Sequence, residues 1–276
     1  MNQLSNPQCL IIDDDQTIYI ADSANHRIIS WKPNDTFGRI VAGGFGKGNQ
    51  TTQLDSPGDL ILDKETNSYF ISDIENKRIM KWSTINNNNG QLFLKDIDCN
   101  GITTDKTGAV YISDSKRNEV KRWRKGEKNG TIVAGGHGQG NSLNQLNYPT
   151  CIFVDDQYSL YISDCLNHRI MKYAQDAKVG VVVAGGNDAG DQLNQLYCPQ
   201  GILIDQLGGI YIADWGNHRV MRWYEDDSEG TVVVGGNQPG QQADQLNCPV
   251  GLAFDAQGNL LVTDSENHRV QKFEVN

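Results

Sequence analysis

The residues of this sequence best suited to metal or acid–base chemistry are its five histidines, and their spacing argues against a shared catalytic centre. Four of them stand between Asn and Arg in a recurring turn: His26, His168, His218 and His268. A residue that occurs once per repeat is held apart from its copies, so these side chains are not expected to converge on one metal ion. We therefore expect structural roles for them. His137 lies by itself in a glycine-rich loop and is expected to be solvated.

The six cysteines contain no Cys-x-x-Cys pair and no zinc-finger spacing. Five of them recur at one place, just before or at the start of the first strand of a repeat: Cys9, Cys99, Cys151, Cys198 and Cys248. This placement predicts that they surround one mouth of a central channel. We expect small, tightly packed and reduced side chains there, and the alternative is a thiolate metal site or a redox pair.

Oxygen ligands for a hard cation are scarce at the same channel mouth. Asp59 is the one carboxylate among these positions, and with Asn100 it would make at best a weak calcium site. The sequence has no G-x-S-x-G elbow, and its glycine loops lead into polar residues rather than into a helix that could hold a phosphate. We predict no catalytic residue, metal or cofactor, with a channel-site metal-dependent lyase or hydrolase as the alternative.

A repeat of about 50 residues must position all of these groups. Strings such as "YIADSANHRI" and "YISDCLNHRI" occur six times, and each contains an aspartate that we call the anchor: Asp22, Asp73, Asp114, Asp164, Asp214 and Asp264. Each repeat reads as four short strands rich in Ile and Val, and no segment has helical apolar spacing. The sequence therefore predicts an all-β, six-bladed β-propeller.

We expect one domain over residues 1–276, with repeats at about 7–44, 57–94, 99–136, 149–186, 199–236 and 249–276. The aromatic residue that recurs in the third strand, as at Trp31 and Trp223, is expected to pack between blades. The Gly-Gly-ending fourth strand has no counterpart after Phe273, and residues 1–6 are too few to supply it. We predict 23 strands and a sixth blade without its fourth strand, unless the native protein continues past Asn276.

The motif of a strand, an anchor Asp, two variable residues and Asn-His-Arg resembles the NHL repeat of ubiquitin-ligase and TRIM-like proteins, RNA-binding regulators and peptide-amidating lyases. The resemblance covers nearly the whole chain and implies a six-bladed propeller. Asn25-His26-Arg27 and three further copies are intact, whereas blade three has Arg117, Asn118 and Glu119 instead. If each Arg pairs with its anchor Asp, Glu119 breaks that pair, and blade three is locally weaker or adapted to another task.

The net charge of −10 disfavours nucleic acid as a general partner. Lys116 and Arg117 lie in a locally basic part of blade three, where RNA binding remains an alternative to a solvated strand. The chain has no apolar stretch long enough for a membrane span and no recognisable leader, so as given it is expected to be cytoplasmic, monomeric and without membrane contact.

In a propeller, the turns between second and third strands share a face with the linkers that lead into the first strands. Apolar residues in these turns are typical of interface anchors, although they could instead fold back over their own blades. We name eight candidate partner-binding residues on this loop face: Trp215, Ile74, Leu166, Lys116, Arg117, Asp59, Asn100 and Gln200. The sequence thus predicts a scaffold for a protein or peptide, with the substrate-recruiting domain of a ubiquitin ligase, whose RING lies outside this chain, as an alternative.

Overall fold

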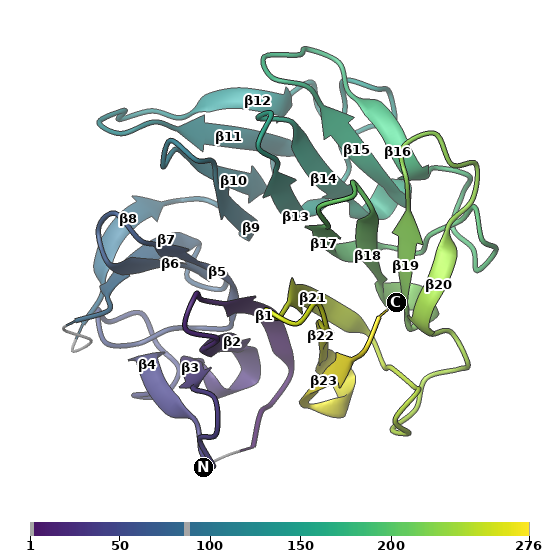
Figure 1. Ribbon diagram of the computed structural model, residues 1–276. Coiled ribbons are helices and arrows are strands. Elements are labelled where there is room, and N and C mark those ends of the chain that lie inside the picture. Colours follow the sequence, from purple (N-terminus) through teal and green to yellow (C-terminus); the bar gives the residue numbers. More distant parts are fainter. Residues whose placement is uncertain (1–2, 86–88, 276) are drawn as a thin grey trace. The chain divides into compact units, whose positions relative to one another are not determined.

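Each sequence repeat forms one antiparallel sheet, and the chain is an all-β six-bladed β-propeller (Figure 1). The computed structural model describes residues 3–85 and 89–275. Blades one and two comprise β1 (Pro7–Ile12), β2 (Ile18–Asp22), β3 (Arg27–Trp31), β4 (Arg39–Gly43), β5 (Pro57–Asp63), β6 (Ser68–Asp73), β7 (Arg78–Ser83) and β8 (Gln91–Lys95). Blades three and four comprise β9 (Cys99–Thr104), β10 (Val110–Asp114), β11 (Glu119–Trp123), β12 (Thr131–Gly135), β13 (Pro149–Val154), β14 (Leu160–Asp164), β15 (Arg169–Tyr173) and β16 (Val181–Gly185).

Blade five comprises β17 (Pro199–Ile204), β18 (Ile210–Asp214), β19 (Arg219–Trp223) and β20 (Thr231–Gly235). Blade six comprises β21 (Pro249–Phe254), β22 (Leu260–Asp264) and β23 (Arg269–Phe273). In four blades a short 3-10 turn follows the second strand: η1 (Ser23–Asn25), η2 (Cys165–Asn167), η3 (Trp215–Asn217) and η4 (Ser265–Asn267). Over the described residues, the predicted three-stranded sixth blade is confirmed.

The chain divides into two compact units. Unit 1 contains residues 1–99 and 251–276, and therefore blades one, two and most of six; unit 2 contains residues 100–250, and therefore blades three to five. The last blade belongs to the same unit as the first, and its strand β22 lies against β1 of blade one. Each unit is described by itself below.

An aspartate closes the tight turn after the first strand of each blade. In unit 2 the Asp155 Oδ1 accepts the N–H groups of Gln157 and Ser159 at 2.9 and 2.7 Å. In unit 1, Asp255 binds the corresponding N–H groups of its turn, and its carboxylate also lies 2.6 Å from the Lys272 ammonium. Burial opposes ionisation of Asp255, but these partners outweigh it and lower its pKa to about 2.

The core of each unit lies between successive blades and is built by the fourth strand of one blade and the faces of the next. In unit 1, Ala42 of β4 belongs to one buried cluster with Ile71, Met80 and Trp82 of blade two. In unit 2, Ala184 of β16 joins the equivalent cluster of blade five around Trp223. Burial of Trp82 and Trp223 agrees with the predicted packing role of the recurring aromatic residue.

Candidate binding face

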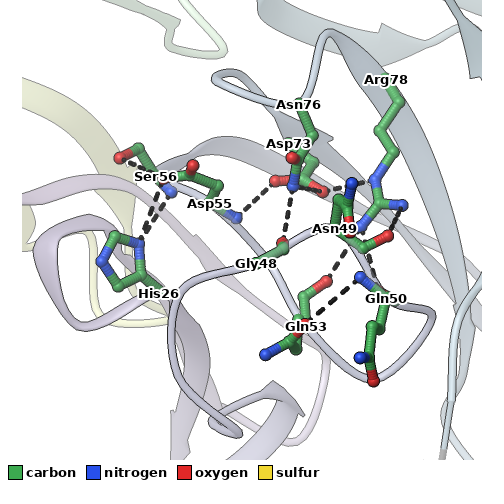
Figure 2. Close-up of polar contacts among 10 residues, drawn as sticks. All are labelled: His26, Gly48, Asn49, Gln50, Gln53, Asp55, Ser56, Asp73, Asn76 and Arg78. Carbon is green, nitrogen blue, oxygen red and sulfur yellow. Dashed lines mark hydrogen bonds and ion pairs between the residues drawn. The ribbon is translucent and has the colours of Figure 1, made fainter.

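The turns and linkers that form the loop face are held by the anchor aspartates. Figure 2 shows the arrangement in blade two, where Asp73 accepts hydrogen bonds from Arg78 Nε at 2.6 Å, Asn76 Nδ2 at 2.9 Å and the Asp55 N–H at 2.6 Å. The Arg78 guanidinium then binds three linker carbonyls, those of Asn49, Gln50 and Gln53, at 2.7 to 3.1 Å. One buried carboxylate thereby fixes both the turn and the linker beside it.

Unit 2 repeats this arrangement in blades four and five. Arg169 and Arg219 each donate Nε to their anchor Asp at 2.7 Å, and both side chains are almost fully buried. Burial raises the pKa of Asp73, Asp164 and Asp214, and the hydrogen bonds from backbone, Asn and Arg act against this rise. The turns of this framework are therefore held rigidly, and the charge of each anchor aspartate is balanced by its arginine.

The histidines of the Asn-His-Arg turns complete the framework instead of forming a reactive centre. His26, His168 and His218 each end their turn at a φ of +53 to +54°, and each Nδ1 accepts a backbone N–H from the following linker at 3.1 Å. Figure 2 shows this contact between His26 and Ser56. The predicted structural role of these side chains is confirmed by their hydrogen bonds.

Blade three reaches the same result with different residues. Arg117 Nη1 lies 2.6 Å from the anchor Asp114, so the expectation that Glu119 leaves this aspartate without its arginine is wrong. Glu119 instead lies 2.7 Å from the Lys121 ammonium. Asn118 takes the place of the histidine, because its Oδ1 accepts the Tyr148 N–H at 2.8 Å. The departure keeps an arginine on the anchor aspartate and presents Arg117 with a largely exposed side chain.

Large apolar side chains lie exposed on this framework in unit 2. Leu166 is 50% exposed and Trp215 is 37% exposed. Their turns bind the adjoining linkers through backbone hydrogen bonds, from Leu166 N to the Asn147 carbonyl at 3.1 Å and from Gly216 N to the Tyr197 carbonyl at 2.9 Å. Leu166 and Trp215 are therefore displayed by a stiff backbone.

Two tyrosines that the sequence reasoning missed belong to the same part of unit 2. Tyr148 and Tyr197 are both exposed, and the Tyr197 ring packs edge-on against His168 with 5.6 Å between centroids. A sequence signal existed, because each is an aromatic residue at the end of an otherwise polar linker. We use the name aromatic arc for three aromatic residues and one leucine: Tyr148, Leu166, Tyr197 and Trp215. Contacts between successive turns and linkers connect these four residues.

The other predicted residues of unit 2 fall into two groups. Lys116 and Arg117 are exposed in the turn of blade three. Asn100 is half-buried and donates to the Ser115 hydroxyl at 2.6 Å, and Gln200 donates to Cys198 Sγ at 3.3 Å. Asn100 and Gln200 thus already have protein partners.

In unit 1 the two predicted residues are more enclosed. Ile74 is half-buried and lies over Gly58, where even a Cβ atom would come within 2.2 Å of its Cδ1. Asp59 is buried, and its Oδ1 accepts the Leu60 N–H at 2.8 Å. Ile74 therefore packs on its own blade.

A disulfide joins Cys165, in the turn of blade four, to Cys198, in the linker that leads into blade five. For Cys198 this disulfide shows that the expectation of a reduced thiol is wrong. The repeat pattern did not reveal the partner, because Cys165 lies outside the recurring cysteine position. The bond lies beside Leu166 and Tyr197 in the chain. It stiffens the centre of the aromatic arc.

The part of the chain that the structure describes contains no group of three or more His, Cys, Asp or Glu side chains placed to hold a metal ion. Within the same residues, no helix has the length and apolar character needed to cross a membrane.

Comparison with known proteins identifies the fold and the family. The profile of the SMP-30/gluconolactonase/LRE-like region matches residues 7–239, and that of the NHL repeat matches residues 246–273. No curated protein matches the chain.

Similar solved structures include auxiliary nutrient binding proteins from Bacteroides thetaiotaomicron and Bacteroides ovatus, with TM-scores of 0.77 at 15% and 14% identity. These matches cover 99% of this chain and 69% and 70% of theirs. A catalytically inactive virginiamycin B lyase from Staphylococcus aureus, solved with quinupristin, has a TM-score of 0.64 at 14% identity over 100% of this chain and 86% of its own. At such identities the likeness shows the propeller fold alone.

Proposed function

The chain belongs to the SMP-30/gluconolactonase/LRE-like family, and we propose that it is a non-catalytic scaffold that binds a protein or peptide partner through the loop face of unit 2. Because propeller neighbours include both binding proteins and a lyase, the fold does not choose between these activities. The observation that carries the proposal is the aromatic arc, four large exposed side chains on a framework of buried ion pairs, backbone hydrogen bonds and a disulfide.

Such an arc has the properties of a binding hot spot. Tyr and Trp bring large contact area at a low cost in side-chain entropy, and a rigid backbone reduces the ordering cost of association further. The exposed cations of Lys116 and Arg117 lie in the next turn along this face. A partner with apolar residues followed by acidic residues fits this combination.

The test is selection from a displayed random-peptide library on the intact protein. Binders that use the arc should weaken at least about tenfold against the Trp215→Ala protein, since an aromatic hot-spot residue contributes roughly 2 kcal/mol or more. Leu207→Ala is the matched control, because Leu207 is 82% exposed in a different type of turn of the same unit. Binders that are indifferent to Trp215→Ala, or a selection without binders, would overturn the proposal.

The same face would serve if the partner were a substrate recruited to a ubiquitin ligase. An RNA partner would depend instead on Lys116 and Arg117, so reversing both to Glu should remove RNA affinity only if RNA is the ligand. A metal-dependent lyase or hydrolase would require bound metal, and elemental analysis of the purified protein would identify it.

A further inference from the structure

The sheet edge at β23 borders an open, largely apolar groove in unit 1. The groove has a volume of about 770 Å³ and is lined on one side by β23 residues such as Val270 and on the other by Ile18, Ile20 and Trp31 of blade one. Leu4 lies at its end. Within the described residues, no strand pairs with the outer edge of β23.

The other blades show what occupies this place when it is filled. In unit 1, β4 pairs with β3, and its Ala42 packs on Ile71, Met80 and Trp82 of the next blade. In unit 2, β16 pairs with β15, and its Ala184 packs on Ile212, Met221 and Trp223. By repeat position, the corresponding residues beside β23 are Ile20, Ile29 and Trp31, and two of these line the groove.

The leucine of the following linker provides a second correspondence. Leu54 and Leu196 are fully buried and lie against the first glycine of the Gly-Gly pair, at Gly43 and Gly185. Leu4 is the equivalent residue by repeat position, and it lines the groove in a half-buried state.

Incomplete burial of the groove walls is consistent with a missing strand. Val270 of β23 is half-buried, whereas Ile170 at the same position of β15 is 0% exposed. Trp31 is likewise half-buried, whereas Trp82 is 1% exposed. An apolar sheet edge of this kind is a template for strand addition.

We propose that this groove binds an extended segment of a partner polypeptide, which adds to β23 as an antiparallel strand and has β-branched residues followed by Ala-Gly-Gly. In the register of β16 on β15, the alanine lies opposite Val270 and the first glycine opposite Arg269. Glycine is needed there because Gly185 has a φ of +66° and a Cβ would come within 2.5 Å of the His168 carbonyl oxygen. This site goes beyond the proposed loop-face function, because it uses a sheet edge in the other unit.

The main-chain hydrogen bonds of such an added strand supply affinity, and the alternate side chains supply specificity. In unit 2 the N–H of the second glycine, Gly186, donates to the His168 carbonyl at 3.0 Å. The equivalent carbonyl beside the groove is that of His268. The residue at the position opposite Val270 is alanine in β4, β12 and β16.

The experiment uses a fluorescein-labelled peptide with the sequence of residues 178–188, KVGVVVAGGND, titrated with the intact protein and followed by fluorescence anisotropy. Saturable binding is expected. The same peptide with its first glycine changed to Val should bind at least about tenfold more weakly, because Gly185 has a φ of +66° in β16 and a Cβ there would come within 2.5 Å of a carbonyl oxygen. Absence of saturable binding, or equal binding of both peptides, would overturn the proposal.

Protein variants locate the site. Ile18→Arg should abolish binding by filling the groove, whereas Leu207→Arg, at an exposed site in unit 2, should leave it unchanged. Trp31→Phe provides a milder variant in case Ile18→Arg does not fold, and it should remove most of the change in intrinsic tryptophan fluorescence that the peptide causes.

Two further results would contradict the assignment. Binding that survives Ile18→Arg but is lost in Trp215→Ala would place the peptide on the loop face. A dimer in sedimentation velocity that the free peptide dissociates would assign the groove to a second copy of this chain instead of a partner.

Discussion

Arg219 and Arg117 form equally short ion pairs with their anchor aspartates, and replacing each with Ala should give very different losses of stability. Arg219 lies 2.7 Å from Asp214 and Arg117 lies 2.6 Å from Asp114. The Arg219 side chain is 5% exposed, whereas that of Arg117 is 54% exposed. Both aspartates are almost fully buried, so the difference lies in the arginines: removing the exposed Arg117 side chain opens a path for water to Asp114, whereas the groups that Arg219 leaves behind stay enclosed.

The magnitude for Arg219→Ala follows from the contacts it loses. Besides the pair with Asp214, its Nη atoms donate to the carbonyls of Asp191, Gln192 and Gln195 at 2.7 to 3.0 Å. Removing one partner of a buried pair costs about 3–5 kcal/mol, and hydrogen bonds to charged groups are each worth about 1.5–3 kcal/mol but do not add fully. We expect a loss of about 3–5 kcal/mol, against about 1 kcal/mol or less for Arg117→Ala.

The assay is urea unfolding followed by tryptophan fluorescence. With a slope of about 3 kcal/mol/M, Arg219→Ala should lower the midpoint by roughly 1–1.7 M and Arg117→Ala by about 0.3 M or less. Equal shifts for the two variants would refute the reasoning that burial, rather than the ion-pair distance, decides the contribution of these arginines.

Three further outcomes can be measured directly. Reducing the denatured protein should release two thiols that the Cys165→Ser, Cys198→Ser double variant does not release, and an unchanged count would contradict the disulfide. The pKa of Asp255 is lowered to about 2, so its stabilising contribution is complete above its unfolded value near 4 and is lost as pH falls through about 2. The wild-type advantage over Asp255→Asn in thermal unfolding should therefore shrink steadily from pH 4 to pH 2, and an advantage that is undiminished at pH 2 would disprove it. Glu119→Arg should destabilise the protein, because it removes the partner of Lys121 and brings two cations together; a gain in stability would argue against this pairing.

Much of the fold was predictable because the interactions that define a blade are local. An anchor such as Asp164 lies five residues from its arginine and three from its asparagine, so one short string carries the whole turn. Repetition of that string about every 50 residues then implies a propeller. The three-stranded sixth blade followed from the same repetition, because the sequence has no counterpart of the fourth strand after Phe273.

The candidate face was only partly predictable, because its decisive contacts join distant residues. Cys165 pairs with Cys198 across 33 positions of sequence. Tyr197 joins the aromatic arc through contacts with the turns of two blades, whereas Ile74, at the same repeat position as the exposed Trp215, packs over Gly58. Exposure at equivalent repeat positions depends on these neighbours and not on residue type.

The sequence by itself determined the number of blades, the anchor network and the missing fourth strand, since each depends on residues close together within a repeat. Only the tertiary structure decided that Arg117 replaces the lost arginine of blade three, which side chains of the loop face are exposed, and that Trp31 and Val270 line an open groove. These properties arise where one blade or linker packs on another, and such packing is set by the three-dimensional position of residues that the repeat pattern treats as equivalent.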